Sequence, residues 1–257
     1  MIYLIGDVGN TLTKIALLNK NFKIIKSYNI ETIKLSNKKN LSKFFKNKLL
    51  KNLNKKILFS SVVPKIFKKI KSHLKNKKYK IFEIKDLNYT KIIKLKISNM
   101  KQIGSDRIAN AIGSYSKYNT NCLIIDFGTA TTFDVIKYPG VYDGGVIAPG
   151  VKLSIINLNK STALLPLIKL KPNSKKYGKN TNDALNAGFI WGYQGLINNI
   201  VKKITLSSKT NYKVILTGGY AKLFKKYLND KCLVDDNITI KGIVKIYRNL
   251  LLWKMKN

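Results

Sequence analysis

The feature that most constrains the fold is an internal repeat of a strand, a tight turn and a second strand. Asp7-Val8-Gly9-Asn10-Thr11 and Asp126-Phe127-Gly128-Thr129-Ala130 share an aspartate, a glycine two positions later, and small or polar residues after it. Each segment ends an apolar run and leads into another, and the two lie nearly half the chain apart. Such a repeat indicates a duplicated unit. We therefore expect an α/β fold of two similar halves with a central cleft.

The rest of the chain alternates short apolar runs, typical of strands, with segments of helical periodicity. Apolar residues recur three or four positions apart in the segments that we predict to be helical, which are 39–54, 64–74, 105–117, 150–160, 182–206, 220–229 and 238–253. We expect one domain over residues 1–117 and a second over 118–257, with a soft boundary because no low-complexity linker separates them.

Both turns of the repeat have the chemistry of an anion-binding site. Gly9 lets the backbone approach a phosphate closely, and successive N–H groups in such a turn can bind an anion. The Asp7 carboxylate would repel phosphate unless a cation lay between them, so we expect it to hold Mg²⁺, directly or through water. One such turn alone could be a plain β-hairpin. Two matched turns favour phosphate binding.

Gly104-Ser105-Asp106-Arg107 opens a predicted helix and contains the only arginine in the first 247 residues. Only a guanidinium binds a carboxylate through two parallel hydrogen bonds, so an arginine kept in a lysine-rich chain suggests an acidic substrate. In this interpretation Asp106 is a general base and Arg107 anchors the substrate. In the alternative, Asp106 caps the helix and Arg107 is a surface residue.

The formal net charge of +37 would ordinarily suggest a nucleic-acid partner. Lysine, however, supplies nearly all of the basic residues and is spread evenly along the chain. Proteins that read nucleic acids rely on arginine, so we expect no nucleic-acid partner and take most of the charge as compositional bias. The positive field would still attract ATP.

We expect a cytoplasmic protein without a membrane span. No apolar run approaches the ~18 residues that a membrane span requires, and the first residues lack the features of a signal peptide. Cys122 and Cys232 each lie in an apolar run, which is typical of core thiols in a reducing compartment. The chain has no P-loop motif and no cysteine–histidine cluster with zinc-ligand spacing.

In their order along the chain, these motifs resemble those of type III pantothenate kinases. The other segments that carry the resemblance are Thr131-Thr132, Gly144-Gly145-Val146-Ile147-Ala148-Pro149-Gly150, Ser161-Thr162-Ala163-Leu164-Leu165-Pro166, Gly178-Lys179-Asn180-Thr181 and Thr217-Gly218-Gly219. The resemblance covers nearly the whole chain. It implies two ribonuclease H-like halves of the acetate and sugar kinase/Hsp70/actin superfamily. It also implies a homodimer that phosphorylates pantothenate with ATP to 4'-phosphopantothenate, the first step of coenzyme A biosynthesis.

The resemblance further implies the site residues. Those that would hold ATP are Asp7, Val8, Gly9, Asn10, Thr11, Leu12, Thr13, Lys14 and Thr129. Those that would meet pantothenate are Gly104, Ser105, Asp106, Arg107 and Thr181, with Asp106 as the proton acceptor. Asp126 would bind a monovalent cation, K⁺ or NH₄⁺, and Asp7 would lie near Mg²⁺.

The chain departs from the family pattern before the helix that starts at residue 105. Ile97 and Met100 stand where the family commonly has a substrate-contacting tyrosine and a proline, which puts one pantothenate contact in question. Two other interpretations therefore remain at this point. One is a kinase of the same fold for another small acid or a sugar, and the other is a basic nucleic-acid-binding regulator that has kept the fold. The intact Asp7, Asp106 and Asp126 argue against the regulator.

Overall fold

The computed structural model describes residues 1–46, 52–172, 176–228 and 231–252. Its contacts divide the chain into two compact units. The first unit comprises Met1–Asn119, Gly140–Tyr142 and Asn237–Asn257, and the second comprises Thr120–Pro139 and Asp143–Asp236. The domain boundary expected at residues 117 and 118 stays a prediction, and the segment after Asn237 packs with the N-terminal part of the chain.

The first unit is built on a five-stranded sheet with the order β3-β2-β1-β4-β5. Strands β1, β2 and β3 are antiparallel neighbours, whereas β4 and β5 run parallel to β1. The strands are β1 (Tyr3–Val8), β2 (Leu12–Leu18), β3 (Ile24–Glu31), β4 (Lys56–Ser61) and β5 (Lys80–Glu83). The helical segments are η1 (Thr32–Ser36), α1 (Lys38–Phe44), α3 (Pro64–Lys75), η2 (Ile84–Asp86), η3 (Tyr89–Lys91), α4 (Ser105–Tyr118), α8 (Ile238–Ile246) and the π-helical η4 (Tyr247–Leu252).

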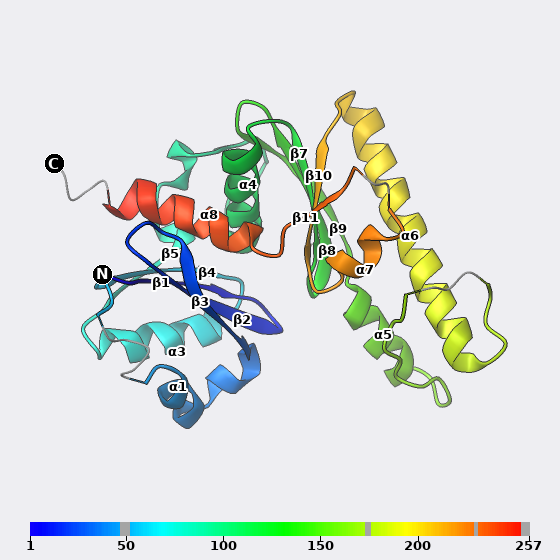
Figure 1. Ribbon diagram of the computed structural model, residues 1–257, viewed down its shortest axis with the longest axis horizontal. Helices are drawn as coiled ribbons and strands as arrows, with labels where there is room; N and C mark the ends of the chain where they lie inside the picture. The colour runs from blue at the N-terminus through cyan, green and yellow to red at the C-terminus, as the bar shows by residue number, and fades with distance from the viewer. Residues whose placement is uncertain (47–51, 173–175, 229–230, 253–257) are drawn as a thin grey trace. The chain divides into compact units, whose positions relative to one another are not determined.

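Helices cover both faces of this sheet. Alternate strand residues such as Leu4, Ile57 and Phe59 form one hydrophobic cluster with α1 and α3. Their neighbours Ile5 and Leu58 are also fully buried and point to the opposite face. Figure 1 shows α1 and α3 on one side of the sheet and α4 and α8 on the other.

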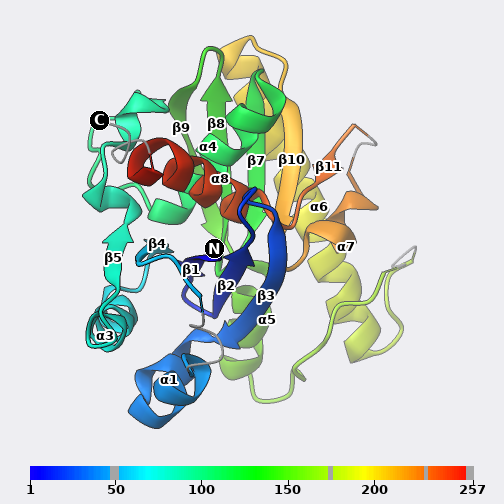
Figure 2. The same cartoon turned by 60° about the vertical axis from the view of Figure 1, so that its left-hand side comes forward.

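Helices α4 and α8 pack closely because glycine faces backbone at their contact. A Cβ atom on Gly242 would lie 1.8 Å from the carbonyl oxygen of Ala109, and one on Gly113 would lie 2.3 Å from that of Ile238. Thr239 of α8 adds a hydrogen bond to the buried side chain of Asn110 in α4. This contact holds the C-terminal helix in the first unit, and Figure 2 shows α8 lying across α4.

The second unit repeats the topology of the first. Its strands follow the order β9-β8-β7-β10-β11, which matches β3-β2-β1-β4-β5 position by position. The two-residue strand β6 (Lys94–Leu95) pairs with Val141 and Tyr142 at the start of β9. The strands are β7 (Cys122–Phe127), β8 (Ala130–Lys137), β9 (Val141–Pro149), β10 (Lys213–Gly218) and β11 (Leu233–Val234). The predicted duplication is therefore confirmed.

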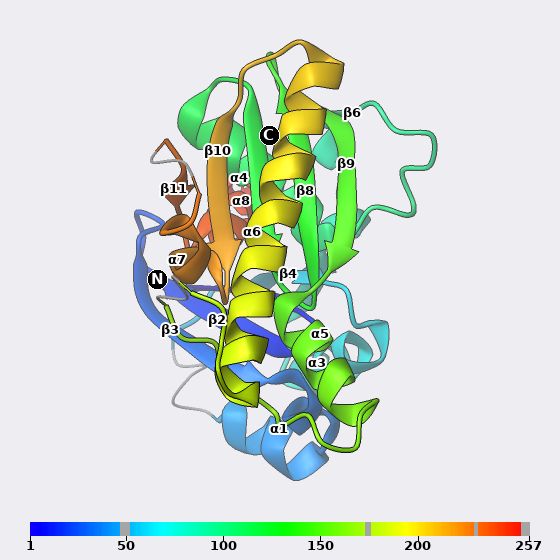
Figure 3. The same cartoon turned by 90° about the vertical axis from the view of Figure 1, so that its right-hand side faces the viewer.

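Three helices cover one face of the second sheet. They are α5 (Val151–Lys160), α6 (Thr181–Ser208) and α7 (Ala221–Lys225). The apolar side chains of Leu123, Ile125 and Phe133 form a cluster with Ile190 of α6 and Phe224 of α7. Figure 3 shows α6 running along this face of the sheet.

The helix predicted over residues 39–54 is wrong in its extent. Helix α1 ends at Phe44, residues 47–51 lie outside the described residues, and Leu53 forms a parallel β-bridge with Ile2. Leu53 is buried, so its apolar character reflects a place beside the sheet rather than on a helical face. Similarly, the helix expected over 220–229 is the shorter α7, and Trp253, the last residue of the expected C-terminal helix, lies outside the described residues.

Candidate active site

The first turn of the repeat, between β1 and β2, is held by hydrogen bonds to its own backbone and to Thr32. The Gly9 N–H donates to the Leu12 carbonyl at 3.1 Å, and the Thr32 hydroxyl donates to the Gly9 carbonyl at 2.6 Å. A Cβ on Gly9 would approach the Leu12 carbonyl to 2.9 Å, so the turn needs a glycine there. The turn is therefore held in place by these hydrogen bonds, with Asn10 and Leu12 exposed at its tip.

Asp7 and Lys14 lie opposite each other at the base of this hairpin. Asp7 is also beside Ser60 of the parallel strand β4. The Lys14 ammonium donates a hydrogen bond to the side chain of Asn237, the residue that precedes α8. The β1–β2 hairpin thus brings together all of the predicted residues from Asp7 to Lys14.

The N-terminus of α4 presents the Asp106 carboxylate. Asp106 Oδ1 accepts a hydrogen bond from the Arg107 N–H at 2.8 Å. A Cβ on Gly104 would lie 2.4 Å from that same oxygen and 3.3 Å from Val62, so the carboxylate occupies the space that a side chain at residue 104 would fill. The glycine of this motif is needed for space rather than for an unusual backbone conformation, because its φ of −67° suits any residue.

Burial raises the pKa of Asp106 above its ordinary value, although the Arg107 N–H, the Arg107 charge and the Lys85 charge oppose the shift. The Arg107 guanidinium lies over the Tyr142 ring, with Cζ 5.8 Å from the ring centroid, and Tyr142 is only 2% exposed. The motif therefore combines a desolvated carboxylate with a guanidinium that rests against a fixed aromatic surface.

Several residues that hold this site gave no signal in the sequence. Thr32, which directly follows β3, holds the β1–β2 turn, Tyr142 of β9 supports Arg107, and Glu83 of β5 contacts Ser61 and Ser105. Each acts across the fold on a residue distant in sequence. Spacing rules could not have found them because no local pattern links the partners.

The second turn lies in the second unit, between β7 and β8, and other predicted motifs brace it. The Gly219 N–H donates to the Phe127 carbonyl at 3.0 Å. A Cβ on Gly218 would lie 2.6 Å from Asp126 Oδ1, and one on Gly150 would lie 2.0 Å from the Thr129 carbonyl oxygen. Gly218 also has φ +86°, a conformation that favours glycine. Gly150, which follows β9, and Gly218, which ends β10, therefore lie where the backbone passes close to Thr129 and Asp126.

Thr181 lies elsewhere in the second unit, as the first residue of α6. Asn180 caps this helix by accepting from the Asp183 N–H at 2.9 Å and donating to the Asp183 carboxylate at 2.8 Å. A Cβ on Gly178 would lie 2.0 Å from the Ala184 nitrogen, so the chain folds tightly back on the helix start. The cap and the glycine together fix the position of Thr181.

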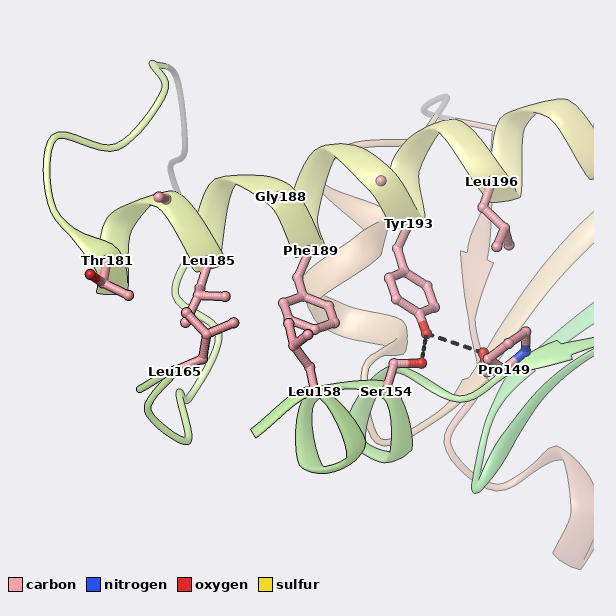
Figure 4. Close-up of a pocket in the computed structure, with 12 residues that line it drawn as sticks. Pro149, Ser154, Leu158, Leu165, Thr181, Leu185, Gly188, Phe189, Tyr193 and Leu196 are labelled. Atoms are coloured by element: carbon pink, nitrogen blue, oxygen red, sulfur yellow. Dashed lines mark hydrogen bonds between the residues drawn. The ribbon is translucent and has the colours of Figure 1, made fainter. Parts of the chain in front are cut away.

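Thr181 also lines an apolar groove of about 540 Å³ between α5 and α6, which we call the α5–α6 groove. Figure 4 shows Thr181, Leu185, Phe189 and Tyr193 along one side of α6. The groove is lined by Pro149, Ser154, Leu158, Leu165, Thr181, Ala184, Leu185, Gly188, Phe189, Gly192, Tyr193 and Leu196. Within it, the Ser154 and Tyr193 hydroxyls are 2.7 Å apart, and the Tyr193 hydroxyl also lies 3.3 Å from the Pro149 carbonyl oxygen (Figure 4).

Across residues 1–46, 52–172, 176–228 and 231–252, no three His, Cys, Asp or Glu side chains gather as a metal site would require. In the same part of the chain, no helix is long and apolar enough to cross a membrane. Any cation at Asp7 or Asp126 would therefore complete its coordination with backbone oxygens, water or a ligand.

Comparisons with known proteins agree with this architecture. Residues 3–203 match the sequence profile of the family described as type III pantothenate kinase. A type III pantothenate kinase from Pelagibacter ubique (strain HTCC1062) is 48% identical over 245 residues, which cover 94% of this chain and 97% of that protein.

Two solved structures have a similar fold. One is the activator of the 2-hydroxyisocaproyl-CoA dehydratase from Clostridium difficile with bound ADPNP, with a TM-score of 0.55 and 12% identity over 96% of this chain and 94% of that one. Another is the inorganic polyphosphate/ATP-glucomannokinase from Arthrobacter sp. strain KM, with a TM-score of 0.50 and 11% identity over 98% and 99% of the two chains. At such low identity these likenesses show the fold alone.

The family match spans most of the chain, and the P. ubique kinase aligns with it almost from end to end. The chain therefore belongs to the type III pantothenate kinase family and phosphorylates pantothenate with ATP in coenzyme A biosynthesis.

Proposed function

We propose that Asp106 is the general base that accepts the proton of the pantothenate hydroxyl as the γ-phosphoryl group is transferred. The observation that carries this role is the desolvated Asp106 carboxylate at the start of α4, in space that Gly104 leaves open. Burial raises the pKa of this carboxyl. A carboxylate whose pKa is raised toward the operating pH takes a proton more readily than an ordinary one.

Arg107 binds the carboxylate of pantothenate in this proposal, and Gly104, Ser105 and Thr181 are further pantothenate contacts. Ser105 would act through its backbone, because its buried hydroxyl is engaged by Glu83 and Ser61. A guanidinium offers a carboxylate two parallel hydrogen bonds, and the Tyr142 ring limits how far the Arg107 side chain can rotate. Support from Tyr142 would matter more in a chain with Ile97 where the family commonly has a tyrosine.

The β1–β2 turn, with residues Asp7 to Lys14, holds the ATP phosphates, and Thr129 makes a further ATP contact. Phosphoryl transfer asks the protein mainly for positioning and for neutralisation of charge. The rigid turn, with the Thr32 clamp on Gly9, suits the first task. Lys14, anchored at Asn237, suits the second.

Asp7 would hold Mg²⁺, directly or through water. The residues fit this ion, because Mg²⁺ keeps several waters and commonly takes one or two carboxylates together with substrate phosphates. Asp7 lies one residue before the end of β1, next to the predicted phosphate turn. When bound, Mg²⁺ would supply neutralisation of the phosphate charge.

Asp126 would bind K⁺ or NH₄⁺. Its Oδ1 borders the space above Gly218 that any side chain would fill, with the Phe127 carbonyl oxygen equally close to that point. Oxygen donors around an open space are what a hard, weakly held cation needs. The cation would offset the negative charge of Asp126 near the second turn.

The chain acts as a homodimer in this proposal, with the α5–α6 groove as the contact between copies. Gly188 and Gly192 lie one helical turn apart in the groove, and a Cβ on either would meet no atom within 4 Å. Leu164 nearby is 90% exposed. Gly188→Arg should therefore give a monomer in light scattering, whereas Gly195→Arg, outside the groove on the same helix, should stay dimeric. A dimeric Gly188→Arg protein would refute this contact.

The enzyme works in the cytoplasm in this proposal. Cys122 and Cys232 are both free and buried, as expected in a reducing compartment.

Asp106→Asn tests the proposed base. The variant keeps the shape and the acceptor oxygen but cannot take the proton, so kcat should fall by about 10²–10⁴-fold in a coupled assay with pantothenate, ATP, Mg²⁺ and K⁺. Asp86→Asn, which removes an exposed carboxylate from the same unit, should leave kcat unchanged. Turnover of Asp106→Asn within a few-fold of the wild type would remove Asp106 from the role.

A further inference from the structure

Ser61, the last residue of β4, is where the two functional segments of the first unit meet. Ser61 pairs with Val8, which precedes the phosphate turn, and the next residue, Val62, donates its N–H to the Val8 carbonyl at 3.0 Å. The Ser105 hydroxyl lies 3.4 Å from the Ser61 carbonyl oxygen. A single strand end therefore contacts both the β1–β2 hairpin and the first residue of α4.

Glu83 reaches this point from the end of the neighbouring strand β5. Its Oε1 accepts from the Ser61 N–H at 3.3 Å, and its Oε2 accepts from the Lys85 N–H at 2.7 Å. The Ser105 side chain also hydrogen-bonds to this carboxylate. Three donors from three segments thus converge on one partly buried carboxylate.

The Ser105 hydroxyl has one proton but two acceptors within reach, the Ser61 carbonyl and the Glu83 carboxylate. Hydrogen bonds to an ionised acceptor are roughly twice as strong as neutral ones. The Ser105 hydroxyl therefore donates its hydrogen bond to the Glu83 carboxylate rather than to the Ser61 carbonyl. Ser105 is fully buried, which prevents water from replacing this bond. The first turn of α4 is therefore tied to Glu83.

Burying the Glu83 carboxylate at this position costs desolvation free energy. Burial raises its pKa, and the three hydrogen bonds from Ser105, Lys85 and Ser61 only oppose that shift, while the Asp86 charge adds to it. An apolar side chain would pack here without the desolvation cost. A carboxylate that is buried at this cost and accepts three hydrogen bonds therefore points to a role in fixing geometry rather than in packing.

We propose that Glu83 is a positioning residue for phosphoryl transfer: through Ser61 and Ser105 it fixes the start of α4, and with it Asp106, against the strand that carries the phosphate turn. The inference rests on the proposed role of Asp106. Glu83 binds neither substrate in this arrangement. Its loss should therefore lower kcat and leave both KM values nearly unchanged.

Glu83→Gln tests the proposal directly. The amide keeps the shape but turns an NH₂ group toward one of the two backbone donors, Ser61 or Lys85. The kcat should fall by about 10- to 100-fold, the size expected for a misplacement of about 1 Å, with KM for ATP and pantothenate within about twofold of the wild type.

Asp86→Asn is the matched control. Asp86 accepts from the Glu83 N–H at 3.1 Å and completes the capping of η2, but it does not contact Ser61 or Ser105. If Glu83 only stabilised the fold, both variants would lower the unfolding midpoint and neither would selectively lower kcat. We expect the selective loss in Glu83→Gln alone, and equal kcat values in the two variants would overturn the proposal.

Ser105→Ala removes the hydrogen bond between Ser105 and Glu83 from the side of α4. It tests the positioning role even if Glu83→Gln does not fold. Its kcat should fall, and the double variant should be no slower than the slower single variant, because both changes remove one connection. A folded Ser105→Ala enzyme with wild-type kcat, or losses that multiply, would refute the link.

Asp106→Asn measured alongside keeps the two hypotheses apart. Retained turnover there would remove the base assignment, whereas a large loss there with an unaffected Glu83→Gln enzyme would remove only the positioning role.

Discussion

Replacing Gly104 by alanine should lower kcat strongly while leaving the protein folded. The added methyl would lie 2.4 Å from Asp106 Oδ1, whereas an ordinary contact for a Cβ atom begins near 3.4 Å. The carboxylate must therefore move by about 1 Å or rotate away. Its side chain can do so cheaply, and the backbone at residue 104, with φ −67° and ψ 145°, accepts alanine without strain.

The two consequences differ in size. Misplacing a reacting group by about 1 Å can cost about 10²-fold in rate, so kcat should fall by about that factor. Loss of the N-cap glycine should cost about 1 kcal/mol of stability. That corresponds to a fall of about 2–4 °C in Tm for a protein of this size. The substitution thus separates geometry at Asp106 from stability of the fold.

The assay is steady-state phosphorylation of pantothenate, with thermal unfolding of the same samples. Gly195→Ala is the control, because its methyl would meet no atom within 4 Å on an exposed helical surface. In an Asp106→Ala background, Gly104→Ala should cause no further loss, since the clashing oxygen is gone. A single variant with kcat within twofold of the wild type, or a full loss that persists in the Asp106→Ala background, would show that the reasoning is wrong.

Three further predictions follow from contacts in the first unit. Gly242→Ala should lower stability by about 3 kcal/mol or more, seen as a lower Tm, because its methyl would overlap a backbone carbonyl of α4, whereas Gly195→Ala should raise stability by up to about 1 kcal/mol. Tyr142→Leu should raise the pantothenate KM by about fivefold, the equivalent of about 1 kcal/mol, while Tyr142→Phe keeps the ring under Arg107 and should not. Asp106→Asn should have a higher Tm than the wild type at neutral pH, because burial raises the pKa of the native carboxyl and so penalises its ionised form. The difference in Tm should shrink toward about pH 4, where the wild type gains stability as the carboxyl protonates. A difference that widens on acidification would contradict this.

Much of the fold could be predicted because the pattern repeats. The two aspartate turns predicted a duplication, and the matching strand orders of the two sheets confirm it. The helix predicted to start at residue 105 does start there, although its N-cap is Gly104 and neither Ser105 nor Asp106 caps it through a side chain. Local signals of this kind are reliable because strand alternation and helix starts depend on residues adjacent in sequence.

Features that depend on distant partners could not be predicted in this way. Leu53 fits a helical face in sequence, yet it pairs beside β1 through a bridge to Ile2. The packing of α8 on α4 depends on Gly113 and Gly242, which are separated by the entire second unit. The role of Glu83 could not be predicted for the same reason, because its partners Ser61 and Ser105 come from two other elements.

Arginine occurs only at residues 107 and 248 of this lysine-rich chain, and its scarcity argues for a function at Arg107 but not at Arg248. Arg248 lies over the Phe22 ring with Cζ 5.5 Å from the centroid, much as Arg107 lies over Tyr142. Lysines occupy similar places, with Lys55 4.9 Å from the Tyr79 ring. Because lysine serves above a ring in this chain, stacking alone does not require arginine at either site. What distinguishes Arg107 is its place beside the Asp106 carboxylate at a helix start, where a two-pronged donor can bind an acid that an ammonium would hold less specifically.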